Sequence, residues 1–290
     1  MNTIAVMPVL PDTFMLSDGE LKAIQLQAAR SVGLGDIRLH DRLSNGTEGP
    51  ELVVIPPGIF EYGAGPGETA SDTERPRRTA VIERAFAIAV DPVTTQAFEA
   101  YARAVGWTPR EELMWLTGRM PVINVRQTDA LDYCAWLSRE TGQRYRLPTE
   151  REWEYACRAG AATPYPYGDT ITLEDVVYHP DKDSCVSREK KPRQLSIRMA
   201  SCGAKEIGQR RPNRWGLRDM IGNVWEFTAS PWTPDHDSAP ELRQPGNPQP
   251  VVTKGGSWFD GPDCCRSAAR FRRLENELDI NLGFRVLREL

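Results

Sequence analysis

Two cysteines stand side by side near the C-terminus, behind a glycine turn. Residues 254–270 read KGGSWFDGPDCCRSAAR, which contains Ser257, Asp260, Cys264 and Cys265. Paired thiolates bind Cu(I) because polarisable sulfur suits a polarisable ion. Adjacent residues rarely direct both side chains at one point, so Cys264 and Cys265 make a poor chelating pair. If the chain is an enzyme, we expect Cys265, Ser257 and Asp260 to carry the catalysis.

The same stretch and the residues after it also carry side chains suited to recognition. Aromatic and arginine side chains supply much of the binding energy at interfaces. We therefore expect the 258–282 loops to bind a protein or a small-molecule ligand. The residues expected at this surface are Trp258, Phe259, Asp260, Asp263, Cys264, Phe271, Arg272 and Arg273.

Composition excludes several other classes of protein. The net charge of −4 over 290 residues gives no basic face for nucleic acid. The sequence has no run of 18 apolar residues, so we expect no membrane span. Its first residues lack the positive charge of a secretory signal, which favours a cytoplasmic location. The three histidines are far apart in the sequence, which argues against a histidine-rich metal site.

The cysteine pattern indicates thiols rather than a disulfide framework. None of the six cysteines forms a CxxC pair, as expected for mostly reduced thiols in a cytosolic protein. Cys185 and Cys202 flank a polar stretch and would close a loop of it if oxidised. The sequence does not decide between thiols and a disulfide at these two positions.

Capping patterns predict where several helices begin. Ser17 with Glu20, and Thr149 with Glu152, have the spacing of capping boxes. The first predicts a helix ending before Gly33, and the second a helix that buries Trp153, Ala156 and Cys157. Thr94 and Thr95 predict the start of another helix. A fourth is expected from about Thr128, with a buried face made of Leu131, Cys134, Ala135 and Ser138.

Between these helices the sequence predicts short strands and long loops. The chain has 23 glycines and 23 prolines, which is typical of many turns. Residues 51–65 predict two short strands around a Pro-Pro-Gly turn. The fold class is therefore α+β with irregular connections. We predict an N-terminal helical extension over 1–49 and one larger domain over 50–290.

Four motifs, in order, resemble one known family. They are ELVVIPPGIFEYG, RLPTEREWEYACRAG, NRWGLRDMIGNVWEFT, and KGGSW followed by RSAAR and NLGFRV. Together they resemble the formylglycine-generating-enzyme (sulfatase-modifying-factor) domain over residues 50–290. The resemblance implies an irregular, loop-rich variant of the C-type-lectin fold, often held by calcium. It implies a calcium site at Glu226 and the backbone of Gly222 and Val224, whose oxygen donors suit that ion.

The resemblance also places the two copper-binding cysteines of the family. Counted from the Gly-Gly-Ser turn, the first falls on Asp260 and the second on Cys265. One soft ligand is therefore a hard carboxylate here, so we do not expect copper, and Ser257 alone performs no oxidation. Iron is not expected either, because the related sulfoxide synthases hold it with three histidines.

Two classes of function remain open. Variable proteins of diversity-generating retroelements resemble this domain and bind partners through the loops between GGSW and GFR, which favours a binding module. The alternative is a metal-dependent oxidoreductase or tailoring enzyme of the same superfamily. Within either, Trp225, Trp258 and Phe284 are expected in the core. Arg266, Arg270 and Arg285 are expected to pair with Glu150, Glu152 or Glu154.

Overall fold

The chain folds around two β-sheets and a separate hairpin. The computed structural model describes residues 10–111, 113–181, 203–236, 238–239 and 247–290. The larger sheet is antiparallel, in the order β1 (Arg38–Leu39), β2 (Leu52–Ile55), β5 (Phe86–Ala89), β11 (Leu287–Glu289) and β6 (Tyr145–Arg146). The hairpin pairs β3 (Gly58–Tyr62) with β4 (Arg78–Ile82). β2 and β3 are the two strands predicted around the Pro-Pro-Gly turn.

The second sheet carries the C-terminal motif. Its order is β10 (Leu282–Phe284), β7 (Trp225–Pro231), β8 (Pro250–Lys254) and β9 (Arg270–Leu274). β10 runs parallel to β7, and the other pairs are antiparallel. β8 and β9 bracket the Gly-Gly-Ser turn and the cysteines, so this sheet positions the residues singled out from the sequence.

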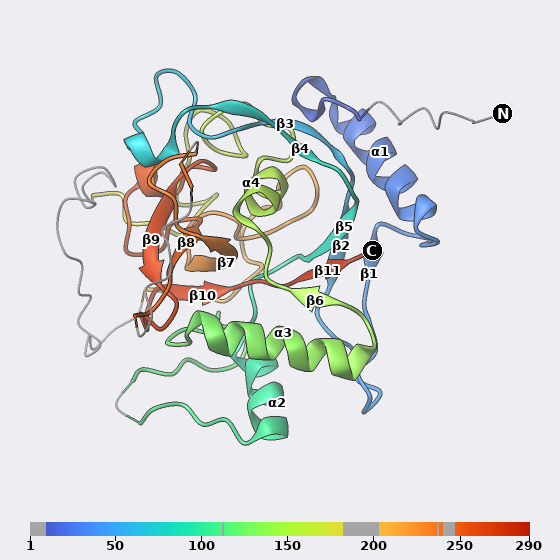
Figure 1. Cartoon of the computed structure of the whole chain (residues 1–290), viewed down its shortest axis with the longest axis vertical. Coiled ribbons are helices and arrows are strands. Elements are labelled where there is room, and N and C mark those ends of the chain that lie inside the picture. The colour runs from blue at the N-terminus through green and yellow to red at the C-terminus, as the bar shows by residue number, and fades with distance from the viewer. Residues whose placement is uncertain (1–9, 112, 182–202, 237, 240–246) are drawn as a thin grey trace.

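The described residues form four α-helices, which are α1 (Asp18–Ser31), α2 (Thr95–Val105), α3 (Gln127–Thr141) and α4 (Glu150–Arg158). Short 3₁₀ helices span Thr13–Met15, Asp72–Glu74 and Pro262–Cys264. α4 contacts the hairpin strands β3 and β4 and also β7 and β8 of the second sheet. Figure 1 shows α1 outside the larger sheet, and α2 and α3 together at the opposite end of the molecule.

The capping signals place three of the helices correctly. Ser17 and Thr149 each form a complete capping box, with Glu20 and Glu152 respectively. The Thr94 side chain accepts a hydrogen bond from the backbone of α2, which begins at the next residue. These caps satisfy backbone N–H groups that have no partner within the helix.

The buried face of α3 differs from the predicted one. The structure buries Ala130, Cys134 and Leu137, while Leu131 is 43% exposed. Both faces have helical spacing, and the predicted one is rotated by one residue. Tyr133 decides the orientation, because its ring packs between Phe98 and Phe284 in the core.

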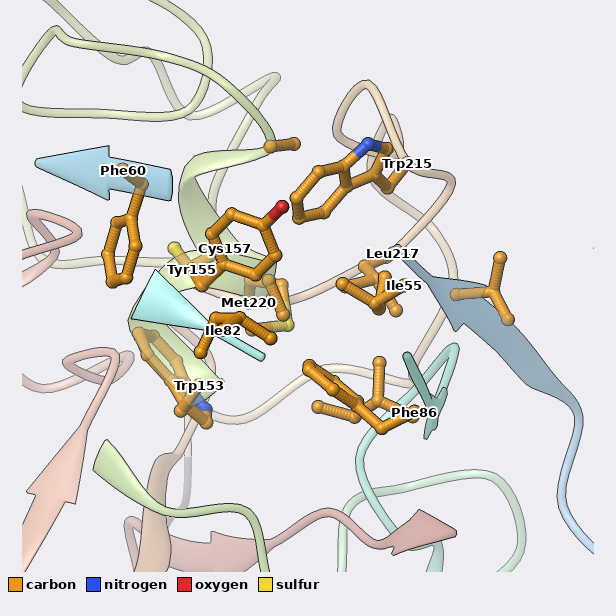
Figure 2. Packing of buried hydrophobic residues seen from close by; sticks show 14 of the residues in the cluster. Ile55, Phe60, Ile82, Phe86, Trp153, Tyr155, Cys157, Trp215, Leu217 and Met220 are labelled. Carbon is orange, nitrogen blue, oxygen red and sulfur yellow. The ribbon is translucent and has the colours of Figure 1, made fainter. Parts of the chain in front are cut away.

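One core cluster surrounds α4. Trp153, Tyr155 and Cys157 are fully buried, as the sequence predicts for two of them. The Tyr155 ring lies between Phe60 and Trp215, with centroid distances of 5.0 and 4.7 Å, and Figure 2 shows this arrangement. Aromatic pairs at such distances add to the stabilisation from burial alone.

The N-terminal helix packs against the same cluster. Leu21 of α1 is fully buried among the residues of that core. Gln25 is also buried, and its side chain donates to the carbonyl oxygens of Val54 and Trp215 at 2.8 and 3.3 Å. None of the described helices is both long and apolar enough to span a membrane.

Candidate functional site

Two glycines bring the loop after β8 against the cysteines. Gly255 and Gly256 have φ angles of 102° and 74°, in the left-handed region that glycine adopts without strain. A Cβ atom on Gly256 would lie 2.6 Å from the carbonyl oxygen of Cys264 and 2.7 Å from Cys265 Sγ. The turn therefore needs glycine both for its backbone angle and for the approach of the cysteine loop.

Ser257 and Asp260 form a buried polar network. Both are fully buried, and the Ser257 hydroxyl donates to Asp260 Oδ2. The same oxygen accepts from Trp225 Nε1 at 2.8 Å, and Asn281 Nδ2 donates to Ser257 Oγ at 2.7 Å. The sequence did not indicate Asn281 or the role of Trp225, because they are far from the turn along the chain.

Cys265 lies at this network as a free, fully buried thiol. Burial, with the charge of Asp260, raises the pKa of Cys265 well above its usual value. The structure thus brings the predicted residues Ser257, Asp260 and Cys265 together. A protonated thiol is a poor nucleophile and a poor metal ligand, because both roles require the thiolate.

Cys264 has a different state from its neighbour. It is fully buried and disulfide-bonded, whereas Cys134 and Cys157 are free thiols like Cys265. Cys264 is therefore an exception to the expectation of mostly reduced thiols, at a position where the sequence contains no spacing signal for a bridge. The predicted Cys185 and Cys202 positions lie outside the described residues.

The donors at this site do not fit a copper ion. Asp260 supplies hard oxygens that already accept hydrogen bonds from Trp225 and Ser257. One protonated sulfur, on Cys265, lies beside it. Cu(I) prefers two converging soft donors, and the disulfide of Cys264 leaves no second thiolate here.

Glu226 forms a buried ion pair with Arg285. Its Oε2 accepts from Arg285 Nε at 2.8 Å and from Trp153 Nε1 at 2.7 Å, and its Oε1 accepts from a second nitrogen of Arg285 at 2.8 Å. A calcium ion at this carboxylate would have to displace those donors. No cluster of three or more His, Cys, Asp or Glu side chains suited to a metal ion occurs in the described parts of the chain. The calcium site at Gly222, Val224 and Glu226 stays a prediction.

The residues predicted for recognition differ in exposure. Arg272 is exposed, whereas the side chains of Asp260, Cys264 and Arg273 are buried. The half-buried members of the predicted set are Trp258, Phe259, Asp263 and Phe271. Of the three predicted core aromatics, Trp225 and Phe284 are fully buried. The contact surface that this loop set offers is therefore smaller than the sequence indicated.

Buried arginine side chains fix these loops through ion pairs with acidic residues elsewhere in the chain. Arg270 pairs with Glu150 at 2.8 Å, as predicted. Arg266 instead pairs with Glu74 at 2.6 Å, and Arg285 with Glu226. The acidic partners lie far away in the sequence, so residue type alone could not identify them. Such pairs fix loop geometry, since each charge is costly to bury without its partner.

A second buried cluster lies next to α4. Lys254 Nζ donates to Glu154 at 2.9 Å, and Glu154 also pairs with Arg158 at 2.9 Å. Nearby, the His236 ring stacks on Tyr62 with centroids 4.1 Å apart. Burial lowers the pKa of His236 to about 4, so its imidazole is neutral at pH 7. The sequence did not indicate this cluster.

Comparisons with known proteins agree with the sequence motifs. Residues 40–290 match the family described as the sulfatase-modifying factor enzyme 1-like domain. The formylglycine-generating enzyme of Mus musculus is 27% identical over 287 residues, covering 81% of this chain and 74% of the relative. The inactive C-alpha-formylglycine-generating enzyme 2 of Mus musculus is 28% identical over 288 residues, covering 81% and 85%.

A solved structure shares the fold. PvdO from Pseudomonas aeruginosa has a TM-score of 0.68 and 28% identity to this chain, and the match covers 83% of this chain and 95% of PvdO. The α+β, C-type-lectin-like fold predicted from the four motifs is therefore confirmed.

Proposed function

The chain belongs to the family of sulfatase-modifying factor enzyme 1-like domains, and from this premise we propose that it binds a protein or small-molecule ligand through its 258–282 loops. The proposal assigns it recognition in place of the copper-dependent oxidation associated with the family's cysteine pair. The observation that carries it is the state of Asp260.

Asp260 occupies the position of one copper ligand and is engaged inside the protein. Its carboxylate accepts hydrogen bonds from Trp225 and Ser257 and is fully buried. Cys265 is a protonated thiol at neutral pH because burial raises its pKa. This site therefore lacks the two thiolates that would bind Cu(I) and activate oxygen.

The loops have the rigidity that a binding surface needs. Arg266, Arg270 and Arg273 are buried and each pairs with at least one carboxylate, with nitrogen–oxygen distances of 2.6 Å to Glu74, 2.8 Å to Glu150 and 3.1 Å to Asp279 respectively. A loop ordered before binding loses less conformational entropy on association. On these loops Arg272 is exposed to solvent, and the rings of Trp258, Phe259 and Phe271 are half-buried. Aromatic and arginine side chains of this kind dominate binding energies.

The relatives of this chain include a protein whose name describes it as inactive. This chain covers 85% of that relative. A domain of this fold is therefore compatible with a role other than catalysis, and function must be argued from the site.

Affinity capture with matched variants tests the proposal. Tagged wild-type protein, Arg272→Glu, Trp258→Ala and the control Arg103→Glu on α2 are incubated with lysate of the native organism. We expect a ligand that wild type and Arg103→Glu retain and that both loop variants lose at least tenfold. Equal capture by all four proteins contradicts the proposed surface.

A second candidate function is oxidation by the same buried group. Ser257, Asp260 and Cys265 do meet in space, as an active site requires. We expect no oxygen consumption when the protein is supplied with Cu(I) or Fe(II) and a cysteine-containing peptide. If the wild type turns over and Cys265→Ser does not, the chain is an oxidase that depends on Cys265, and the binding proposal is wrong.

A further inference from the structure

The turn between β1 and β2 contains an asparagine followed by a glycine. Asn45, Gly46 and Thr47 follow one another here, and all three are exposed to solvent. Gly46 has a φ angle of 82°, in the left-handed region that glycine adopts without strain. A Cβ atom placed on Gly46 would meet no atom within 4 Å outside its chain neighbours. The space beside this glycine is therefore open.

Two hydrogen bonds from Thr47 converge on the side-chain carbonyl of Asn45. Its Oδ1 accepts from the backbone N–H of Thr47 at 2.9 Å and from the Thr47 hydroxyl at 2.6 Å. Donors placed in this way withdraw electron density from the carbonyl carbon. They also stabilise the negative charge that develops on the oxygen when a nucleophile adds to that carbon. The turn thus holds an activated amide beside the backbone nitrogen of the following residue.

Backbone hydrogen bonds at the base of the turn hold the Gly46 nitrogen in the closed conformation. The Gly46 N–H donates to the carbonyl oxygen of Leu43 at 2.9 Å, and the Leu43 N–H donates to that of Thr47 at 2.9 Å. Hydrogen bonds in solvent-exposed loops open locally at little cost in free energy, so a fraction of the molecules releases this nitrogen. The released nitrogen loses its proton to hydroxide. Its reactions therefore become faster as the pH rises.

We propose that Asn45 is a site of spontaneous conversion to aspartate and isoaspartate. The deprotonated nitrogen of Gly46 attacks Cγ of Asn45 and forms a five-membered imide, a ring closure favoured because both groups belong to one short segment. The bond from Cγ to the side-chain nitrogen breaks, and that nitrogen leaves as ammonia with the proton that Gly46 gave up. Water then adds to one of the two imide carbonyl carbons and opens the ring to aspartate or isoaspartate. The proposal is independent of the function assigned to the 258–282 loops.

The conversion changes a turn that contacts α3. The Ser44 hydroxyl donates to the Glu140 carboxylate of α3. Either product places a new negative charge on the residue next to Ser44, and like charges repel, so the charge opposes this contact with Glu140. Isoaspartate also adds one carbon to the backbone, which disturbs the pairing of Leu43 with Thr47. We expect the contact between the turn and α3 to weaken, and the change to stay local because residues 44–48 are exposed.

Peptide mapping of aged protein tests the proposal. Purified full-length protein is incubated at neutral and at mildly alkaline pH, mass spectrometry follows the replacement of the side-chain NH₂ by OH, and isoaspartyl methyltransferase labels isoaspartate. Asn276 is the matched internal control, because it is also exposed in a turn but is followed by Glu277. Thr47→Val removes the hydroxyl and keeps the shape of the side chain, whereas Thr47→Ser keeps the hydroxyl. Thermal melts establish that each variant is folded.

We expect Asn45 to convert at least tenfold faster than Asn276, and faster at alkaline than at neutral pH. Thr47→Val should slow the conversion of Asn45 at least threefold, while Thr47→Ser should keep the wild-type rate. Equal rates at Asn45 and Asn276 overturn the proposal. Equal rates in wild type and Thr47→Val overturn the activation of the amide by Thr47.

Discussion

At the scale of single residues, the chemistry of the C-terminal site depends on the neighbours of one carboxylate. Asp260 accepts hydrogen bonds from Trp225 and Ser257, and burial together with the charge of Asp260 raises the pKa of Cys265. A cysteine at position 260 would instead supply a second sulfur ligand beside Cys265, and it would remove the charge that disfavours the Cys265 thiolate. Substitution at residue 260 therefore tests whether Asp260 is the residue that prevents this loop from binding copper.

Asp260→Cys should restore copper binding. The variant supplies a second soft ligand beside Cys265 and removes the negative charge that opposes its ionisation. We expect wild type to retain far less than one Cu(I) per molecule after competition with a chelator, and Asp260→Cys to retain about one. Asp260→Cys combined with Cys265→Ser is the control and should lose the ion again.

His236 should make stability depend on pH below neutrality. Its pKa falls from 6.5 to about 4 on folding, mainly through burial. Between these values the unfolded chain binds a proton that the folded chain does not, so the free energy of unfolding decreases as the pH falls from 6.5 to 4. The slope is about 1.4 kcal/mol per pH unit from this group.

His236→Phe keeps a ring on Tyr62 and removes the titration. We expect the dependence of the urea midpoint on pH to flatten between 6.5 and 4 in this variant. The exposed His40→Gln is the matched control. A profile for His236→Phe that keeps the wild-type slope assigns the effect to other groups.

At the scale of elements, a buried ion pair between Glu154 and Lys254 connects α4 to β8. Burial alone would raise the pKa of Glu154, but Lys254 and Arg158 outweigh it and lower that pKa to about 2. Lys254 also donates to the carbonyl oxygen of Ala268 at 3.0 Å, which links the pair to the turn that precedes β9. The favourable part of this interaction is present above pH 4.5 and is lost as the pH falls toward 2.

Lys254→Met should destabilise the fold strongly. It leaves Glu154 buried with one cation in place of two, and removing a partner from a buried pair costs about 3–5 kcal/mol. Chemical denaturation should show this loss, whereas the exposed Arg103→Met should change stability by less than about 0.5 kcal/mol. A near-neutral Lys254→Met would mean that Arg158 alone compensates the carboxylate.

Element boundaries followed from local chemistry, while contacts between elements did not. The caps at Ser17, Thr94 and Thr149 are encoded within four residues and were predicted correctly. The buried face of α3 was displaced by one residue, because several faces have similar spacing and distant rings choose among them. The partners of Arg266 and Arg285 were missed for the same reason, since a charge does not specify which opposite charge it meets.

At the scale of the whole molecule, the N-terminal helix shares the core of the rest of the chain. Leu21 packs in the cluster that contains Trp153 and Trp215, and the Gln25 side chain donates hydrogen bonds to the backbone carbonyl oxygens of Val54 and Trp215, two members of that cluster. β1 extends the larger sheet by pairing with β2. We therefore expect α1 to unfold together with the remainder.

Leu21→Ala tests this expectation. Removing a fully buried leucine costs about 2–5 kcal/mol, and the loss should appear as a shift of a single unfolding transition followed by both circular dichroism and tryptophan fluorescence. Leu173→Ala, at a side chain that is 49% exposed, should produce little change. Two separate transitions would instead support an independent extension over 1–49.

The side chains of the edge strand β9 differ in burial from one residue to the next. Arg270 and Arg273 are buried in ion pairs, Phe271 and Leu274 are half-buried, and Arg272 is exposed. A randomised library centred on Arg272 and the exposed positions around it would therefore leave the buried ion pairs untouched, and many of its members should fold. The domain is thus a starting scaffold for engineered affinity reagents, whatever its natural ligand.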